Sequence, residues 1–442
     1  MNNKQYYTHS SKLVFKNKTM HTHARRIVFI TISIFMLSCL NISSVYAQDY
    51  NRKELIKSLK TSLKAQKYSQ ADELLTKAMQ QHKEAANDAE LCNIHLNTVH
   101  HLAESENRKL FLNNKPDTTQ YFKQIYRIYN IGLYCDSICN KPDKKGKINT
   151  KYTSNIQDKL LLYRNNLKSA GKFYYKKQKY DDAFKYIDMY LKTKDIPLIT
   201  DTHHTSSQNK LNDSDSLGMY QLAVFSAYGA KDYKNAKKYI NKALADTTHM
   251  SLLYQIGSKT YAELGDTIQA LDYLYKGWRE DPQKEYFYLT LIQYYNNHKQ
   301  YNEALKIIDE QLDTDSLNIQ LWYIKGKCYQ CLEKYQEAVC SYERAIKINA
   351  EDAQSLSSLG NTYILMARQV FEKNTANVGT NEYRKARSQQ NKLYNCAKTY
   401  LEKARAIVPD TPSLWLTDLS EVYYKLNKGK ELKELERIKK KM

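Results

Sequence analysis

Cys328 and Cys331 have the Cys-x-x-Cys spacing that can carry redox or zinc chemistry. A zinc site of this type needs a second pair with similar spacing, and the sequence contains none. A redox-active pair needs to begin a helix, where the helix dipole lowers the thiol pKa. The surrounding pattern predicts that both cysteines lie inside a helix. We therefore interpret them as half-buried helix residues and predict no metal site.

The other cysteines follow no disulfide framework. After residue 47 they are odd in number and irregularly spaced, which excludes a small disulfide-stapled scaffold. The full set after residue 47 is Cys92, Cys135, Cys139, Cys328, Cys331, Cys340 and Cys396.

The histidines do not form a recognisable catalytic motif. His203 and His204 lie in a polar stretch and are predicted to be a solvated pair, while His95, His100 and His101 fall on a predicted helix. His95 and His100 are five residues apart, so they would not share a helix face well. A glycine-rich phosphate loop, a nucleophile elbow and a His-Glu-x-x-His pattern are all missing from the sequence. We predict that the protein is not an enzyme and uses no cofactor.

Positive charge is the other chemical feature of the chain. Lysine and arginine number 68 against 47 acidic residues, a net charge of +21. Such a surface can bind nucleic acid, and lysines flank three aromatic residues in the stretch 172–177. Tyr174 in that stretch also falls on a predicted core position, so we favour packing as its role. Anionic lipid or polysaccharide is the alternative ligand for the basic surface.

A leader at residues 1–47 carries basic residues and no acidic residue. Arg25 and Arg26 precede an apolar run from Ile27 to Leu40, and Val45-Tyr46-Ala47 closes the segment. This order is typical of an export signal cleaved after Ala47, and it predicts a periplasmic protein. Export argues against nucleic acid as the ligand.

Three points about the leader stay open. Met20 is an alternative start that gives a more compact signal. The leader could also remain uncleaved as a membrane anchor, or Cys39 could be lipidated. No later stretch is apolar for long enough to span a membrane, so we expect no transmembrane span in the mature chain and allow association with the cell envelope.

Composition indicates which elements position these residues. The chain has 442 residues, 42% of them hydrophobic, with only 12 glycines and 6 prolines but 39 tyrosines. So few turn residues would leave a β-sandwich or an α/β fold short of tight connections, whereas a helical array needs few. We therefore predict an all-α fold.

A period of 34 residues organises the region 217–352. Four ungapped blocks begin at Leu217, Ser251, Glu285 and Ile319. Each block has a bulky fourth residue, an alanine at position 20 and a large residue at position 24, with spacings that place them on one helical face. Each block is predicted to form two amphipathic helices, which must stack on their neighbours to bury that face. The alanines are Ala236, Ala270, Ala304 and Ala338.

These residues resemble the tetratricopeptide repeat (TPR) family. The block from Ile319 matches its pattern best, through Trp322, Gly326, Tyr329, Tyr335, Ala338, Tyr342 and Ala345. Ala350 departs from the usual proline, which the block from Ser251 supplies as Pro282. The chain is also similar to exported TPR proteins of Gram-negative bacteria. The resemblance implies a solenoid of helical hairpins with an irregular helical N-terminal region.

The predicted organisation has five parts. They are a signal peptide at 1–47, a degenerate helical repeat region at 48–163, a repeat with a polar insert at 164–216, four contiguous repeats at 217–352, and a repeat with an insertion followed by a helix pair at 353–442.

The resemblance further implies a function. First helices of successive TPR hairpins line a concave groove that binds a protein or peptide, so we predict an exported, non-catalytic scaffold, with envelope assembly or transport as natural settings. The groove residues that it implies are Lys168, Lys172, Tyr175, Lys176, Gln221, Phe225, Tyr228, Gln255, Lys259, Gln293, Asn296, Asn297, Tyr323, Lys327 and Gln330. The family's clamp for chaperone tails needs Lys and Asn in one repeat. Here Lys168 and Lys172 occupy those places, so that ligand is not predicted.

Overall fold

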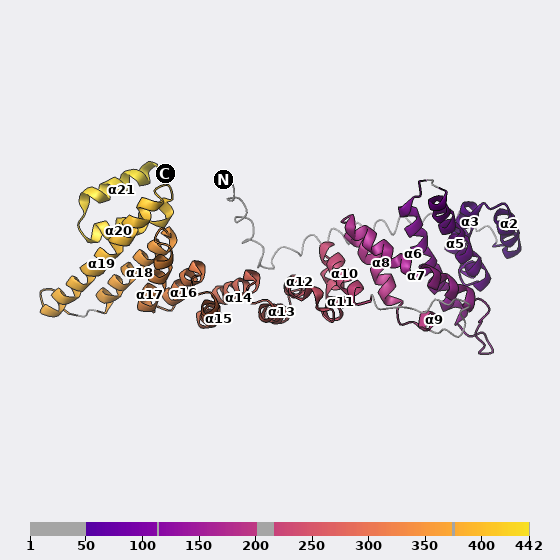
Figure 1. The fold of residues 1–442 in the computed structure, drawn as a ribbon, viewed down its shortest axis with the longest axis horizontal. Coiled ribbons are helices and arrows are strands. Elements are labelled where there is room, and N and C mark those ends of the chain that lie inside the picture. The colour runs from indigo at the N-terminus through magenta and orange to yellow at the C-terminus, as the bar shows by residue number, and fades with distance from the viewer. Residues whose placement is uncertain (1–49, 113–114, 201–215, 374–375, 442) are drawn as a thin grey trace, which may run out of the picture. The chain divides into compact units, whose positions relative to one another are not determined.

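Every regular element in the described part of the chain is a helix, and that part contains no β-strand. The computed structural model describes residues 50–112, 115–200, 216–373 and 376–441 (Figure 1). The predicted signal peptide, with Met20 and Cys39, lies outside these residues, as do His203 and His204. The all-α prediction is confirmed. The chain divides into two compact units, 1–156 and 157–442, which we describe separately.

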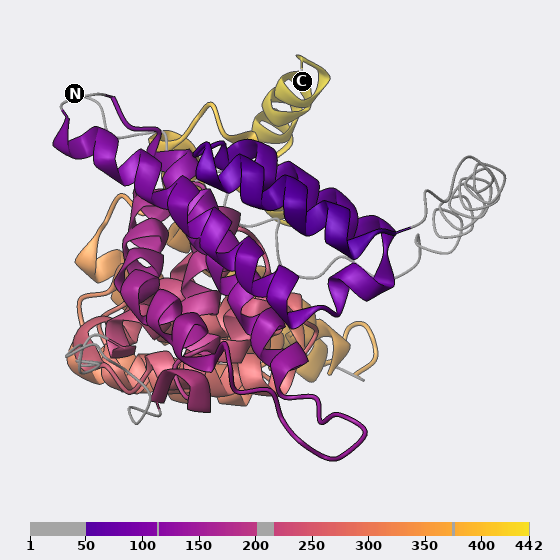
Figure 2. The same cartoon turned by 90° about the vertical axis from the view of Figure 1, so that its right-hand side faces the viewer.

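The first unit begins with a short helical hairpin followed by two long helices. A buried core joins the hairpin to the first of the two long helices. It consists of Leu59, Ala71, Leu75, Ala85 and Leu91. In Figure 2 these helices, in indigo and purple, lie side by side. The helices are α2 (Arg52–Lys64), α3 (Tyr68–Gln81), α4 (Lys83–Ala86), α5 (Ala89–Phe111), α6 (Thr118–Cys139) and the start of α7 (Thr153–Lys176).

Helices α5 and α6 pack along their length, and three of the cysteines lie in their interface. Cys92 on α5 and Cys135 and Cys139 on α6 are buried. A hydrogen bond with Cys92 and burial raise the pKa of the Cys135 thiol far above its usual range. These thiols therefore behave as core residues and not as nucleophiles.

The second unit is an array of helix pairs. The second helices of the four predicted blocks begin at Tyr233, Thr267, Tyr301 and Tyr335, each 34 residues after the last. The helices are α8 (Tyr180–Lys192), α9 (Pro197–Thr200), α10 (Ser216–Gly229), α11 (Tyr233–Ala243), α12 (Met250–Glu263), α13 (Thr267–Glu280), α14 (Glu285–Asn297), α15 (Tyr301–Thr314), α16 (Ile319–Cys331), α17 (Tyr335–Ile348), α18 (Ala353–Glu372), α19 (Asn381–Ile407), α20 (Leu416–Lys425) and α21 (Gly429–Lys441), with 3₁₀ turns η3 (Thr247–His249) and η4 (Pro412–Leu414).

One backbone device turns the chain inside each pair. Residue 15 of each block adopts a left-handed conformation, and the next N–H bonds back to the preceding helix, as from Asp232 to the Ala227 carbonyl at 2.8 Å. This is a Schellman cap. The residues at position 15 are Lys231, Gly265, Lys299 and Glu333, with φ of 59°, 78°, 58° and 59°. The same conformation occurs at Gln66, Gln178 and Asn427, which turn α2–α3, α7–α8 and α20–α21.

Small residues let the helices of a pair approach, and large residues join one pair to the next. The four alanines at position 20 are buried. Trp278 on α13, Phe287 on α14, Ile308 on α15 and Leu321 on α16 belong to one core cluster, so the hydrophobic core is continuous across repeats. Each pair depends on its neighbour to bury apolar surface, as expected of a solenoid.

The predicted insertion after residue 363 takes the form of longer helices. Helix α18 extends to Glu372 and α19 starts at Asn381, so the pair is longer than the others. Tyr394, Leu401, Trp415 and Leu419 belong to a core that continues into α20 and α21. Among the described residues, no helix is both long enough and apolar enough to cross a membrane.

Candidate functional site

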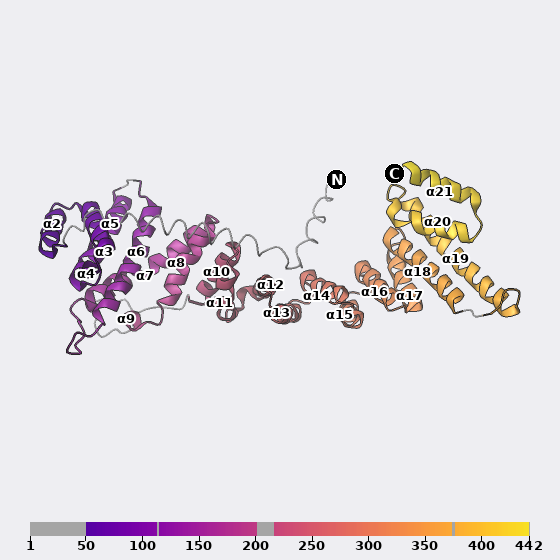
Figure 3. The same cartoon turned by 180° about the vertical axis from the view of Figure 1, so that it is seen from behind.

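The predicted groove residues lie on the first helices of successive pairs. Figure 3 shows α10, α12, α14 and α16 along one side of the array and their partners α11, α13, α15 and α17 along the other. First helices also contact one another directly, as between α10 and α12 and between α16 and α18. We call the surface formed by α10, α12, α14 and α16 the first-helix face.

Three of these helices bring one residue each to a common point. Tyr228 lies on α10, Lys259 on α12 and Tyr286 on α14. The Lys259 ammonium lies over the Tyr286 ring, 5.0 Å from its centroid. The Tyr286 hydroxyl is 3.0 Å from the Ser258 hydroxyl, a hydrogen bond that fixes the ring between two repeats. Burial raises the pKa of Tyr286; the hydrogen bond with Ser258 lowers it by less, and the nearby Tyr228 hydroxyl raises it slightly.

Lys259 is a half-buried cation without an acidic partner in the described part of the chain. Burial lowers its pKa, and the neighbouring ammonium of Lys284 lowers it further. Among the described residues, no carboxylate lies within ion-pair distance of Lys259. Lys284 is better satisfied, because its ammonium donates to the Ser251 hydroxyl at 3.2 Å, which itself donates to Asp281 at 2.9 Å. The site around Lys259 therefore has an uncompensated positive charge that is partly shielded from solvent. An anion bound there would be stabilised.

Two of the predicted groove amides join neighbouring repeats, and a third, Gln221, bonds within its own repeat. Gln221 is buried and donates to the Asp246 carbonyl at 3.0 Å. Asn296 on α14 accepts from the Cys328 thiol on α16 at 3.2 Å. Gln330 on α16 donates to Asn361 on α18 at 2.7 Å. Asn296 and Gln330 connect first helices, and Gln221 binds the turn after α11, so all three are less available to a ligand.

The other predicted residues keep some exposure. Lys168 lies over the Tyr190 ring at 5.6 Å, Tyr175 packs against Tyr180, and Phe225 packs against His249. Tyr323 packs against Tyr342, and Gln255 is half-buried. The exposed ones are Lys172, Lys176, Gln293, Asn297 and Lys327.

Sequence reasoning missed Tyr286 and the polar continuation beyond α16. Tyr286 occupies position 2 of its block, a groove position in the repeat pattern, so the same rule could have found it. Further along, Asn361 on α18 donates to Asp418 on α20 at 2.9 Å, and Arg368 pairs with Glu421. Burial raises the pKa of Asp418. No repeat signal in the sequence predicts these pairs across 57 and 53 residues.

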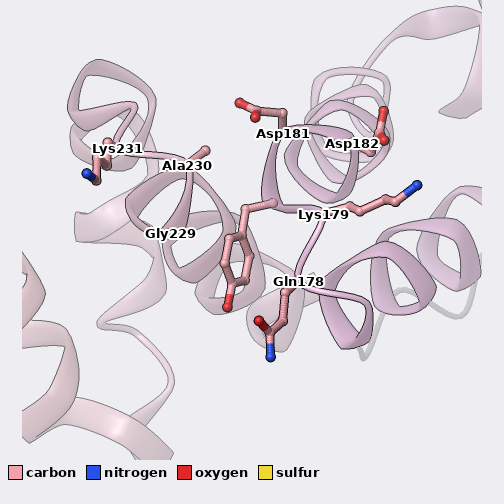
Figure 4. Close-up of a pocket in the computed structure, with 8 residues that line it drawn as sticks. Gln178, Lys179, Asp181, Asp182, Gly229, Ala230 and Lys231 are labelled. Atoms are coloured by element: carbon pink, nitrogen blue, oxygen red, sulfur yellow. The ribbon is translucent and has the colours of Figure 1, made fainter.

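A pocket of about 440 Å³ lies beside the turn between α7 and α8 and the turn after α10. The charged side chains that line it do not point toward a common centre (Figure 4). It is lined by Gln178, Lys179, Tyr180, Asp181, Asp182, Gly229, Ala230 and Lys231. In Figure 4 the charged side chains of Lys179 and Lys231 point to opposite sides, and Asp181 and Asp182 point away from each other. Catalysis would require these groups to meet at one point.

Cys328 and Cys331 both lie in α16, as interpreted from the sequence. Cys328 is buried and Cys331 is exposed. Burial raises the pKa of Cys328 to about 12, which is the opposite of what a reactive thiol needs.

Hairpins stacked at a fixed interval, with hydrophobic clusters shared between neighbouring pairs and polar and aromatic residues on their first helices, define a helical-repeat solenoid. The 34-residue interval, the small residue at position 20 and the cap at position 15 specify the type of repeat. The chain is a tetratricopeptide-repeat protein.

Comparisons with known proteins agree with this assignment. Residues 273–345 match the family model described as anaphase-promoting complex, cyclosome, subunit 3. A TPR repeat-containing protein of Methanocaldococcus jannaschii is 24% identical over 34% of this chain and 34% of its own length. The chain thus spans about a third of that curated relative.

Two solved structures of TPR proteins are similar to part of this chain. The C-terminal part of a TPR repeat-containing protein from Cytophaga hutchinsonii is 15% identical with a TM-score of 0.40, covering 59% of this chain and 89% of that one. A TPR repeats protein from Bacteroides fragilis is 17% identical with a TM-score of 0.29, covering 59% of this chain and 98% of that one.

Proposed function

We propose that the protein is a non-catalytic scaffold whose first-helix face binds an extended, acidic segment of another protein. The observation that carries this proposal is Lys259, a half-buried ammonium without an acidic partner in the described part of the chain. A carboxylate from a ligand would supply the missing charge, and the partial burial would strengthen the pair relative to one in open solvent.

The surroundings of Lys259 suit a peptide. The Tyr286 ring beside it offers flat apolar surface, with Tyr228 close to Tyr286, which favours an aliphatic or aromatic neighbour of the acidic residue. Gln293 and Asn297, on the exposed part of α14, can hydrogen-bond a peptide backbone. We expect the Lys259 ammonium, the tyrosine rings and the side-chain amides together to recognise an extended segment.

Charge reversal at Lys259 tests this function. We expect Lys259→Glu to weaken binding of a fluorescent peptide of alternating Glu and Leu at least tenfold in a polarisation titration, because a carboxylate would meet a carboxylate. Lys234→Glu is the matched control, since Lys234 is an exposed lysine on the second helix α11 and changes net charge equally. Its effect should be less than twofold at physiological salt.

Two results would contradict the proposal. One is equal affinity for the Glu peptide and its Gln counterpart. The other is equal weakening by both charge reversals, which would indicate attraction by net charge alone. Salt-sensitive binding to anionic lipid vesicles or acidic polysaccharide, with no binding of the peptide, would favour the basic surface as the functional feature instead.

We also propose that the scaffold acts after export, with the leader removed. The support is the order of basic, apolar and small residues that ends at Ala47. N-terminal sequencing of protein from fractionated cells should find a chain that starts at Gln48 in the periplasmic fraction. An intact leader on protein in the cytoplasmic fraction would overturn export and make nucleic acid a ligand to test.

A further inference from the structure

One turn of α5, in the first unit, brings together three side chains that can ligate a metal. His100, His101 and Glu104 each offer a ligand atom, and these atoms all lie within 4.8 Å of one another. The Glu104 carboxylate is 3.6 Å from His100 Nε2 and 3.1 Å from His101 Nδ1. The first-helix face and its proposed ligand play no part in this cluster.

Helix geometry explains why the three side chains converge. Residues three and four apart on a helix lie on the same face, one turn above one another. Glu104 is four residues after His100 and three after His101, so its side chain lies between the two imidazoles. From the sequence we considered only the spacing of His95 and His100. We therefore missed Glu104, which lies close to both His100 and His101.

The surroundings hold the ligands in place. The side chain of His100 is 10% exposed, against 40% for His101 and 35% for Glu104, so the site is open on one side only. The His101 ring stacks on Tyr68 of α3, with centroids 4.6 Å apart, which restrains its orientation.

We propose that His100, His101 and Glu104 bind a divalent transition metal, with zinc as the best match. Imidazole nitrogen with carboxylate oxygen is a zinc ligand set, whereas calcium and magnesium prefer oxygen ligands only. Three protein ligands leave a fourth position for water or for a group from a partner. Arg108 lies 3.9 Å from the Glu104 carboxylate and its side chain is 74% exposed, so the protein does not bury it against the proposed site.

Metal titration of the untagged mature chain tests the site. After treatment with a chelator, the protein is expected to bind one equivalent of Zn²⁺ in calorimetry. Co²⁺ in place of Zn²⁺ should give visible absorption bands of a low-coordinate site. His100→Ala and Glu104→Gln should each weaken Zn²⁺ binding at least tenfold and abolish those bands. Zn²⁺ should also slow amide hydrogen exchange in α5 of the original chain and not of the variants.

Control variants address the other histidines. His203→Ala/His204→Ala removes the adjacent pair in the polar insert, and His82→Ala removes a histidine outside α5; both should bind Zn²⁺ like the original chain. Failure to bind Zn²⁺ at micromolar concentration would mean that the three residues are only a salt-bridged helix turn. Equal binding by the His100 and Glu104 variants, or loss of binding in the His203/His204 control, would place the metal elsewhere. Peptide binding at Lys259 is unaffected by any of these outcomes, so the two proposals fail separately.

Discussion

Replacing Gly277 by alanine is expected to lower the stability of the second unit by about 2 kcal/mol. Gly277 lies in α13, where a Cβ would come within 2.2 Å of the Phe287 ring on α14. Phe287 is completely buried in the core cluster, so its ring has no free space into which to move. Alanine gains up to about 1 kcal/mol in helix propensity, which offsets part of the cost.

Tryptophan fluorescence during urea unfolding measures this change, because Trp278, Trp322 and Trp415 all lie in the second unit. Gly218→Ala is the matched control: it lies in α10, and nothing is within 4 Å of a Cβ there, so its substitution should be neutral or stabilising. Phe287→Leu removes the atoms that clash, so the double variant should lose less than the sum of the two single losses. Strictly additive losses would show that the contact is not the cause.

The repeat array was predictable because its signal is local and recurrent. A small residue at position 20 and large residues at positions 4 and 24 follow from the way two helices cross, and every hairpin repeats that crossing. The cap at position 15 was not predicted. Lys231, Lys299 and Glu333 have no preference for a positive φ, so only Gly265 carries a sequence signal for it.

The sequence predicted which residues lie on the first helices, but not which of them are free of contacts with neighbouring elements. Lys259 and Tyr228 followed from the repeat pattern. Gln221, Asn296 and Gln330 satisfy the same pattern, but they hydrogen-bond to the neighbouring element. A polar groove residue is available to a ligand only where no neighbouring element lies within hydrogen-bond distance. The sequence of a single block does not contain that distance.

The first unit was the least predictable, because its polar contacts join helices that no period relates. Asp72 on α3, His95 on α5 and Arg127 on α6 form one partly buried network, in which Asp72 and Arg127 are an ion pair and His95 contacts the carboxylate. His95 Nε2 lies 2.9 Å from the Asp72 carboxylate, and Arg127 donates to both of its oxygens, at 2.8 and 2.6 Å. Residues 23 and 55 positions apart in sequence meet here, so a search for motifs could not find them.

Replacing Asp72 by asparagine is expected to destabilise the first unit by about 2 kcal/mol at pH 7. The amide keeps the shape of the side chain but leaves Arg127 without a counter-charge in a site where Asp72 and His95 are largely buried. Hydrogen exchange of amides in α3, α5 and α6 measures the loss. Fluorescence of the tryptophans in the second unit should not change, and a change there would contradict a local effect.

The same network predicts a pH dependence with a definite sign. Burial acts to raise the pKa of Asp72, but hydrogen bonds from His95 and Arg127 outweigh it and lower the pKa from 3.8 to about 2. A lowered pKa contributes stability above the unfolded value, and this contribution, about 1 to 2 kcal/mol, is lost as the pH falls from about 4 to 2. The difference in free energy of unfolding between the original chain and Asp72→Asn should therefore become smaller as the pH falls from about 4 to 2. Urea unfolding followed by circular dichroism measures this difference. A gap that stays constant from pH 7 to pH 2 would show that the ionised carboxylate does not stabilise the unit.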